Sequence, residues 1–271
     1  MPHNHKHIII TGGSSGIGFA LAKLYAQQGH KISIIARDID KLKLAKSQID
    51  AIPAAVEICS ADVGDFQSIQ HAIQTVTKKN GAPHLLICSA GYARPGHFSQ
   101  LELDIYQRSM SVNYFGTLNT IKAITPFLAQ TKQSHIVLIS SAAALLGIYG
   151  YSAYAPSKFA LIGLAEVLRQ EFSSKNTHIS IAYPGDTMTP QLEYENQFKP
   201  QATRIISKSA GLMSAEKAAE IIAKGIKRKK FAIHFSLELS LLYRFGNLVK
   251  PFLNFYFDRK IQKHVKQHEK A

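Results

Sequence analysis

Three side chains in the middle of the sequence have the types and spacing of an acid–base group. Ser141 lies 13 residues before Tyr154, and Lys158 lies four residues after it. On a helix, Tyr-x-x-x-Lys places both side chains on one face, where an ammonium group lowers the phenol pKa from its usual value of about 10. Tyr154 could then protonate a carbonyl while Lys158 binds ribose hydroxyls and Ser141 hydrogen-bonds the substrate oxygen. Asn113 is a candidate to hold a water that resupplies the proton.

A glycine-rich turn near the N-terminus has the pattern of a dinucleotide phosphate site. The run Thr11-Gly12-Gly13-Ser14-Ser15-Gly16-Ile17-Gly18 directly follows three isoleucines. Gly12 permits a tight turn, and Gly16 and Gly18 let the backbone and the next helix approach a pyrophosphate at the helix N-terminus. A dinucleotide site followed by a proton donor indicates hydride transfer. We expect cofactor contacts here from Gly12, Ser14, Ser15, Gly16, Ile17 and Gly18.

The end of the second expected strand indicates which dinucleotide is used. Ala36 stands where an acid often holds the ribose 2′-hydroxyl, and Arg37 follows it. Because a guanidinium pairs well with a 2′-phosphate, the sequence favours NADPH over NADH. Asp38 is either a ribose ligand or a helix N-cap, and Lys41 is either a second phosphate contact or a solvated side chain.

Apolar strands alternate with amphipathic helices along most of the chain, which predicts an α/β fold of the Rossmann type, a doubly wound parallel sheet of about seven strands. We expect one catalytic domain over 1–235 and a basic amphipathic extension over 236–271. The polar segment 186–211 is interpreted as a lid, a binding loop or an irregular surface loop. Strands are expected at 7–11, 31–36, 55–60, 84–89, 135–140, 178–183 and 231–235, and helices near 17–29, 39–50, 66–80, 102–130, 152–174 and 214–228.

The motifs resemble the short-chain dehydrogenase/reductase family over about residues 5–235. The glycine run matches its cofactor motif, and Cys88-Ser89-Ala90-Gly91 matches a second one in part, with Cys88 and Ser89 where the family usually has asparagines. The resemblance implies a catalytic tetrad of Asn113, Ser141, Tyr154 and Lys158. It further implies that the cofactor contacts Asp62 and Val63 near the adenine, Ala90 and Gly91, and, around the carboxamide, Pro184, Gly185, Thr187 and Thr189.

Within that family the chain is most similar to the 3-ketodihydrosphingosine reductases, in the stretches 148–154, 159–166, 182–190, 199–200 and 203–207. This similarity implies NADPH-dependent reduction of a long-chain lipophilic ketone in sphingolipid biosynthesis. A reductase of steroids, retinoids or 3-oxoacyl groups and a non-catalytic NADP(H)-binding regulator are the alternatives. Four residues form either an apolar substrate wall or ordinary core, namely Leu145, Leu146, Ile148 and Tyr149.

The C-terminal tail carries much of the positive charge. The chain has a net charge of +14, and the last 45 residues hold eleven Lys/Arg against three Asp/Glu, a net of +8. The apolar stretch 237–257 is interrupted by Arg244, Lys250 and Pro251, and a spanning helix needs about 20 apolar residues. We therefore expect an interfacial segment on a membrane surface, or a face packed on a partner subunit. A second Tyr-x-x-x-Lys match, Tyr256 and Lys260, belongs to this tail.

The sequence also predicts the cellular compartment and the oligomeric state of the protein. The first strand begins within the first few residues, and Cys59 and Cys88 are read as buried free thiols of a reducing compartment. These features predict a cytoplasmic protein, peripheral on the cytosolic face of a membrane. The family resemblance implies a homodimer or homotetramer built on the helices near 102–130 and 152–174. No metal-ligand spacing and no nucleic-acid recognition motif is present in the sequence.

Overall fold

Seven parallel strands form the central sheet of the computed structural model, which describes residues 6–50, 55–207 and 211–268. Their order is β3-β2-β1-β4-β5-β6-β9, so the direction of winding reverses between β1 and β4. Ile10 of β1 pairs with Ile34 of β2 on one side and with Ile87 of β4 on the other. The strands are β1 (His7–Thr11), β2 (Lys31–Ala36), β3 (Val56–Ser60), β4 (Leu85–Cys88), β5 (Ser134–Ile139), β6 (Thr177–Tyr183) and β9 (Ala232–His234).

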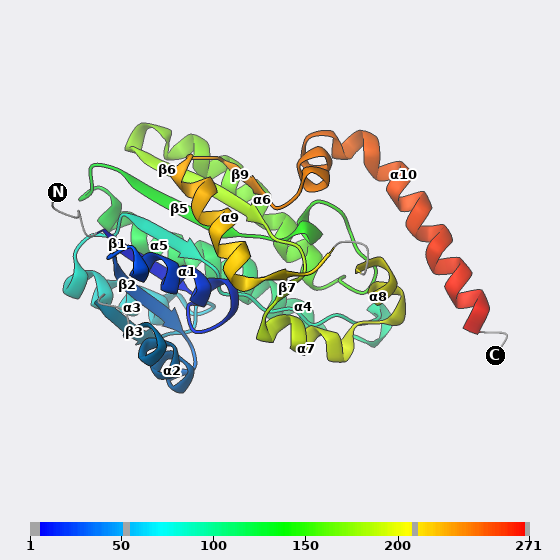
Figure 1. Ribbon diagram of the computed structural model, residues 1–271, viewed down its shortest axis with the longest axis horizontal. Helices are drawn as coiled ribbons and strands as arrows, with labels where there is room; N and C mark the ends of the chain where they lie inside the picture. Colours follow the sequence, from blue (N-terminus) through cyan, green and yellow to red (C-terminus); the bar gives the residue numbers. More distant parts are fainter. Residues whose placement is uncertain (1–5, 51–54, 208–210, 269–271) are drawn as a thin grey trace.

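Helices cover both faces of this sheet (Figure 1). One layer holds α1 (Gly16–Gln27), α2 (Ile39–Asp50) and α9 (Ala215–Lys227). The opposite layer holds α3 (Phe66–Asn80), α5 (Gly116–Leu128) and α6 (Tyr154–Glu171). The predicted single-domain, doubly wound α/β fold is thereby confirmed.

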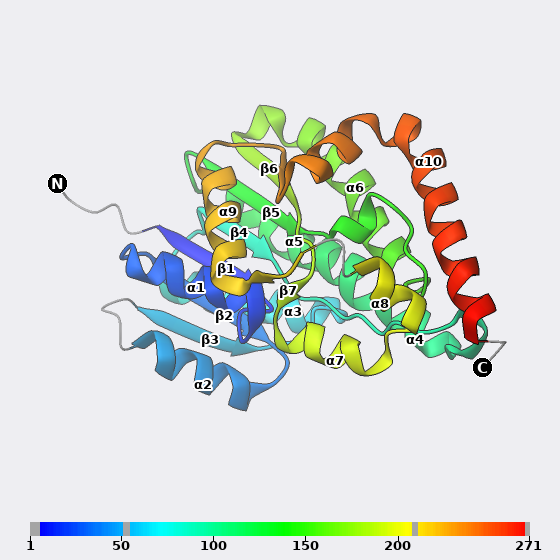
Figure 2. The same cartoon turned by 45° about the vertical axis from the view of Figure 1, so that its right-hand side comes forward.

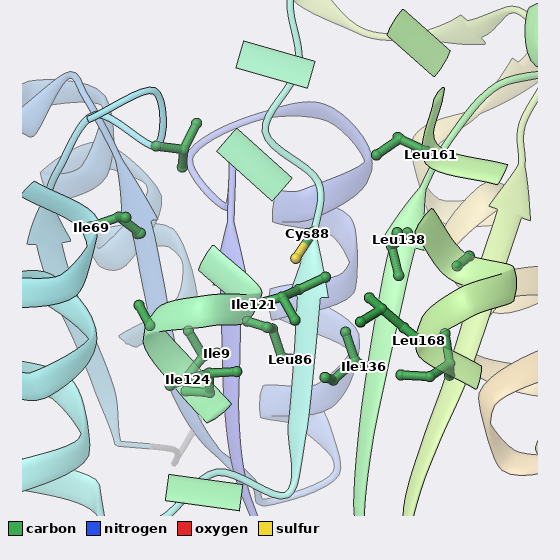
Figure 3. Packing of buried hydrophobic residues seen from close by; sticks show 14 of the residues in the cluster. Ile9, Ile69, Leu86, Cys88, Ile121, Ile124, Ile136, Leu138, Leu161 and Leu168 are labelled. Atoms are coloured by element: carbon green, nitrogen blue, oxygen red, sulfur yellow. The ribbon is translucent and has the colours of Figure 1, made fainter. Parts of the chain in front are cut away.

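Two apolar cores lie between the sheet and its helix layers. Ile9 of β1 and Leu86 of β4 point toward Ile121 of α5, as Figure 3 shows. Ile8 and Ile10 point to the other face, among side chains of the α1, α2 and α9 layer. Because successive strand residues face opposite helix layers, the strands must be apolar throughout, as their sequences are.

The expected continuous helix 102–130 is divided into three parts. A π-helical turn (Met110–Phe115) separates α4 (Leu103–Ser109) from α5. A π-helical turn holds one more residue than an α-helical turn, and such turns often accompany functional sites. Asn113 lies on this turn, and its side chain is buried inside the protein.

The segment 186–211, for which an irregular loop was one interpretation, is largely ordered. It contains the short strand β7 (Thr187–Met188), which pairs with β8 (Met213–Ser214), and the helices α7 (Pro190–Phe198) and α8 (Gln201–Ser207). Thr189 caps α7, because its Oγ1 accepts a hydrogen bond from the Leu192 backbone at 3.2 Å, and Pro190 occupies the first turn. Residues 208–210 lie outside the described part of the chain.

The tail forms one long helix, α10 (Leu237–His268), with a kink where Phe245 leaves helical geometry. It extends away from the sheet and passes α8, where Ile205 and Ile206 lie near Ile261 (Figures 1 and 2). Leu239 and Leu242 pack against the core on the α6 side. None of the helices in the described ranges is long and apolar enough to cross a bilayer. Short 3₁₀ turns complete the fold at Phe98–Gln100, Ala142–Ala144 and Ser173–Lys175.

Candidate active site

A cavity of about 910 Å³ opens at the carboxyl ends of the strands. It lies at the point where the sheet order reverses, the usual ligand position in a doubly wound fold. Three of the predicted site residues do not line it, namely Gly18, Asp62 and Asn113. The predicted residues that do line it are Gly12, Ser14, Ser15, Gly16, Ile17, Arg37, Lys41, Val63, Ala90, Gly91, Ser141, Tyr154, Lys158, Pro184, Gly185, Thr187 and Thr189.

The glycine turn has the geometry of an anion site. Gly12 and Gly16 have φ values of +69° and +56°, which residues other than glycine rarely adopt. A Cβ on Gly18 would lie 2.3 Å from the carbonyl oxygen of Gly12, so this glycine lets the helix pack against the turn. Ser15 caps α1 without a side-chain hydrogen bond, which leaves the first amides of the helix available to a phosphate.

The backbone that follows β6, where the nicotinamide end of a cofactor is expected, borders open space. A Cβ built on Gly185 would meet no atom within 4 Å, so the backbone after β6 faces space that a ligand can fill. The cavity runs continuously from the glycine turn to Gly185. These features fit an extended dinucleotide with its pyrophosphate at α1.

Arg37 and Asp38 follow β2 at the rim of the cavity. Asp38 Oδ1 accepts hydrogen bonds from the backbone of Asp40 at 3.0 Å and of Lys41 at 3.1 Å, so it is the N-cap of α2. The Lys41 ammonium lies 3.7 Å from the same carboxylate. The Arg37 side chain also lines the cavity, and within the described ranges it forms no ion pair. Asp62 is half-buried and does not line the cavity, and its Oδ1 accepts a hydrogen bond from the Gly64 backbone at 2.8 Å.

The acid–base group sits in the middle of the cavity. Tyr154 opens α6, and Lys158 lies one turn later, with its Nζ 5.7 Å from the tyrosine ring centre. The Lys158 ammonium donates to the Ile139 carbonyl at the end of β5, at 2.9 Å. Ser141 follows the same strand, lines the cavity beside Tyr154 and lowers the pKa of its phenol against the larger effect of burial. The structure therefore brings the three predicted side chains together.

Burial controls the protonation of this group. Burial raises the pKa of Tyr154, and the carboxylate of Glu195 adds to the increase. Burial also lowers the pKa of Lys158 to about 8. Lys158 is not among the groups that shift the pKa of Tyr154 in the protein alone, so the lowering of this pKa by its ammonium remains a prediction. With its pKa raised, Tyr154 is a neutral phenol at pH 7, which is the proton-donating form.

Asn113 lies behind the cavity and not in its wall. Its Oδ1 accepts from the Tyr92 backbone at 2.8 Å, and its Nδ2 donates to the Tyr92 carbonyl at 2.9 Å and to Ser157 Oγ at 2.8 Å. The amide thereby joins the segment after β4 to α6. The predicted part of Asn113 in holding a proton-relay water remains a prediction.

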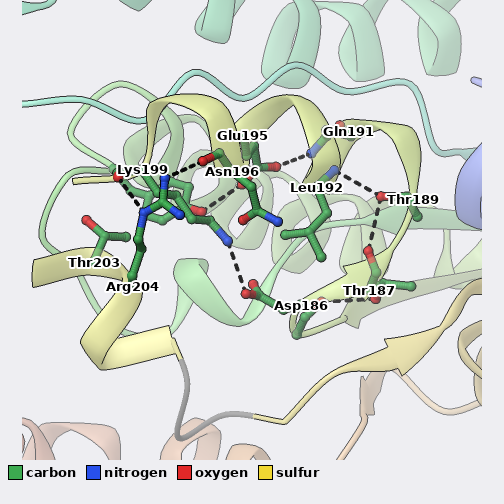
Figure 4. A network of polar contacts seen from close by, with 12 residues as sticks. Asp186, Thr187, Thr189, Gln191, Leu192, Glu195, Asn196, Lys199, Thr203 and Arg204 are labelled. Carbon is green, nitrogen blue, oxygen red and sulfur yellow. Dashed lines mark hydrogen bonds and ion pairs between the residues drawn. The ribbon is translucent and has the colours of Figure 1, made fainter. Parts of the chain in front are cut away.

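A polar cluster near Tyr154 was not selected from the sequence. Glu195 of α7 accepts hydrogen bonds from the Tyr151 hydroxyl at 2.7 Å and from Gln191 Nε2 at 2.9 Å. Lys199 forms an ion pair with Asp186 at 3.1 Å beside it (Figure 4). Thr189-Pro190 was the signal that could have revealed these residues, because a helix starting there puts Gln191 and Glu195 on one face.

The remaining wall is apolar. Leu146 and Ile148 line the cavity as one interpretation expected, whereas Leu145 packs in the core and Tyr149 lies at the surface beside His97. The tail completes the wall from the other side. Its contribution comes from α10, through Leu239, Leu242, Leu253 and Phe257.

Replacing Gly18 by alanine tests the packing of the cofactor turn. We expect Gly18→Ala to weaken binding of a nicotinamide dinucleotide at least about tenfold, because the new methyl group displaces α1 from the Gly12 carbonyl. Titration calorimetry measures the affinity. Gly163→Ala is the matched control, since a Cβ there meets no atom within 4 Å. Equal affinity in Gly18→Ala and Gly163→Ala would contradict the proposed role of the turn.

Comparison with known proteins agrees with this geometry. A family model described as short chain dehydrogenase matches residues 6–200. The chain is 36% identical over 237 residues to a 3-dehydrosphinganine reductase of Danio rerio, which covers 86% of this chain and 71% of that protein. It is 35% identical over 271 residues to a 3-ketodihydrosphingosine reductase of Dictyostelium discoideum, covering 93% and 81%.

Solved structures show the same fold. A short chain dehydrogenase/reductase from Burkholderia phymatum in complex with NAD superposes with a TM-score of 0.80 at 22% identity, covering 92% of this chain and 97% of that one. A short-chain dehydrogenase from Sphingobium yanoikuyae in complex with NADPH gives a TM-score of 0.78 at 22% identity, covering 92% and 94%. The similarity expected from the sequence is confirmed, and the chain belongs to the short-chain dehydrogenase family.

Proposed function

We propose that this chain reduces the 3-keto group of 3-ketodihydrosphingosine to the alcohol of dihydrosphingosine, with NADPH as hydride donor, in sphingolipid biosynthesis. The observation that carries the proposal is one continuous cavity that joins the glycine turn, the acid–base group around Tyr154 and a long apolar wall. Such a wall suits an alkyl chain, and relatives that match most of this chain are named for this reaction.

The protein's own residues carry the proton chemistry. When bound, the reduced nicotinamide supplies a hydride to carbon 3 of the substrate. Tyr154 donates its hydroxyl proton to the carbonyl oxygen, which converts the ketone to an alcohol and leaves a phenolate. Ser141 hydrogen-bonds that oxygen and orients it, and the Lys158 ammonium stabilises the phenolate. Asn113 holds the segment after β4 in place.

The preference for NADPH follows from the rim of the cavity. The Arg37 guanidinium pairs with the 2′-phosphate, and Lys41 is a second phosphate contact beside it. Asp62 and Val63 lie near the adenine, and Gly18 supports the pyrophosphate turn from behind. The nicotinamide carboxamide is held after β6, by the segment that contains Pro184, Gly185, Thr187 and Thr189.

The tail places the enzyme on the cytosolic face of a membrane, where its substrate is dissolved. One face of α10 lines the cavity, and the opposite face carries an exposed apolar stripe. Leu248 and Phe252 are 71% and 77% exposed, and basic side chains flank them, as in interfacial helices. We define the stripe as Leu241, Phe245, Leu248, Phe252 and Phe255. A homodimer or homotetramer through α5 and α6 remains a prediction.

Replacing Tyr154 by phenylalanine tests the reaction. NADPH oxidation by the wild type with 3-ketodihydrosphingosine in detergent is expected, and Tyr154→Phe should lower kcat by about 10³-fold because the proton donor is lost. Its affinity for NADPH should stay within about threefold. Tyr256→Phe, in the second Tyr-x-x-x-Lys pair, is the control and should keep its activity. Turnover of other ketones but not of this one would contradict the substrate assignment.

Cofactor preference depends on one guanidinium. Arg37→Ala should weaken NADPH binding by at least about tenfold and NADH binding by less than about threefold, because only NADPH offers the 2′-phosphate. Fluorescence titration with both cofactors measures the two affinities. Lys43→Ala is the control, since Lys43 is an exposed neighbour on α2 paired with Asp40 at 3.4 Å. Equal weakening of both cofactors would show that Arg37 does not select NADPH.

The apolar stripe is tested with vesicles. The double variant Leu248→Ser, Phe252→Ser should bind anionic liposomes at least about tenfold less in cosedimentation, because it removes two large apolar side chains from the membrane-facing side. Activity in detergent should persist. Leu103→Ser is the control, because Leu103 is 71% exposed on α4. Unchanged liposome binding together with a smaller oligomer on sizing would assign the stripe to a partner subunit.

A further inference from the structure

A buried carboxylate stands at the substrate end of the cavity. Glu195 is 6% exposed, and it is the one buried acidic residue in the ranges 6–50, 55–207 and 211–268. It lines the same cavity as Tyr154 and Lys158. Carboxylates are seldom buried unless a cation or several donors accompany them. The surroundings of Glu195 therefore indicate which chemical group a ligand of this cavity carries.

The protein surrounds Glu195 with neutral donors. Its two oxygens accept hydrogen bonds from the Tyr151 hydroxyl at 2.7 Å and from Gln191 Nε2 at 2.9 Å (Figure 4). Within the described part of the chain no ammonium or guanidinium group lies within ion-pair distance of it. Lys199, the residue that follows α7, is already paired with Asp186 at 3.1 Å.

Lys158, the lysine of the acid–base group, is engaged elsewhere. Lys158 donates to the Ile139 carbonyl at 2.9 Å and serves the cofactor side of the site. Burial raises the pKa of Glu195, and its hydrogen bonds and the nearby Lys199 offset this only in part. A buried carboxylate without an adjacent cation is costly, and a cationic ligand group would remove much of that cost.

Glu195 is also close to the reacting centre. Its hydrogen-bond partner Tyr151 packs against Tyr154 with ring centres 5.6 Å apart. A substrate whose ketone oxygen meets the Tyr154 hydroxyl therefore lies in the cavity that Tyr151, Gln191 and Glu195 also line. In 3-ketodihydrosphingosine the carbon next to the ketone bears a primary amine, whose pKa is close to that of an α-amino group, about 8. A carboxylate beside such an amine favours its ammonium form.

We propose that Glu195 binds the ammonium group that the substrate carries on the carbon next to its ketone. This proposal rests on the proposed function and extends it, because it explains how an amino ketone is selected over other lipophilic ketones. Tyr151 and Gln191 hold the carboxylate in position. The ion pair fixes the substrate headgroup, so the ketone is presented to Tyr154 and the alkyl chain is directed along the apolar wall.

The test compares two substrates and two variants. Glu195→Gln keeps the shape but removes the charge. Its amide oxygen can accept from Tyr151, and its amide nitrogen can donate to Gln191 once the Gln191 amide turns to present its oxygen. Glu193→Gln makes the same change at an exposed position of α7. The substrates are 3-ketodihydrosphingosine and the same molecule with hydrogen in place of the amine. Kinetics with saturating NADPH give kcat and KM for each pair.

We expect the loss of the Glu195 charge to affect the amino ketone and not the analogue without the amine. Glu195→Gln should raise KM for the amino ketone at least about tenfold, with kcat within about threefold, because a charge-assisted contact is lost. KM for the analogue without the amine should change by less than about twofold. Glu193→Gln should match the wild type on both substrates. In thermal melts with NADPH, dihydrosphingosine should stabilise the wild type more than Glu195→Gln, and N-acetyl-dihydrosphingosine should not distinguish them.

Three outcomes overturn the proposal, and they are distinguishable. An equal loss on both substrates would make Glu195 a structural residue of the α7 wall. An unchanged KM for the amino ketone would show that its ammonium group binds elsewhere. A wild type that reduces the analogue but not the amino ketone would contradict the proposed function itself, and the ammonium site with it.

Discussion

The parallel alignment of the seven strands is the constraint on which the whole site depends. Parallel strands end at the same edge of the sheet, so segments far apart in the sequence meet there. Gly12 follows β1, Gly91 follows β4, Ser141 follows β5 and Gly185 follows β6, and all four line one cavity. The alignment requires strands that are apolar on both faces and helices on both sides, which the two cores provide.

Burial gives this cavity its electrostatic character. It raises the pKa of Tyr154 and of Glu195 and lowers that of Lys158 to about 8. Each shift favours the neutral form, because a charge loses solvation inside the protein. The charges of a bound cofactor and a bound substrate therefore also influence the pKa values of these three groups. A phenol that keeps its proton suits reduction with Tyr154 as the proposed donor.

Much of the fold could be predicted because its signals are local. The strand at 7–11 and the helix at 66–80 have the predicted bounds, since apolar runs and amphipathic periods determine them directly. The helix 102–130 was expected to be continuous, because no residue pattern announces a π-helical turn. The turn is accompanied by tertiary hydrogen bonds of Asn113 to Tyr92 and Ser157, which a sequence does not display.

The site residues that belong to a recognisable motif could be predicted from the sequence, whereas those of α7 could not. The glycine turn and the Ser141, Tyr154 and Lys158 group follow from spacing and context. The polar composition of 186–211 concealed α7, although Thr189-Pro190 is a recognisable helix start. Glu195 was missed because a glutamate in a polar stretch is normally solvated, whereas in the fold it is buried and hydrogen-bonded to Tyr151.

The central claim is that, in this cavity, a hydride is transferred to carbon 3 of a keto lipid and a proton to its carbonyl oxygen. The most direct measurement follows deuterium from NADPH deuterated at the nicotinamide C4 position into the lipid, by mass spectrometry of the product. Each of the two hydrogens on nicotinamide C4 is replaced by deuterium in a separate experiment. We predict that one of the two labelled cofactors gives dihydrosphingosine with a single deuterium, bonded to carbon 3. Product without deuterium from either label, or no product despite bound cofactor, would contradict it.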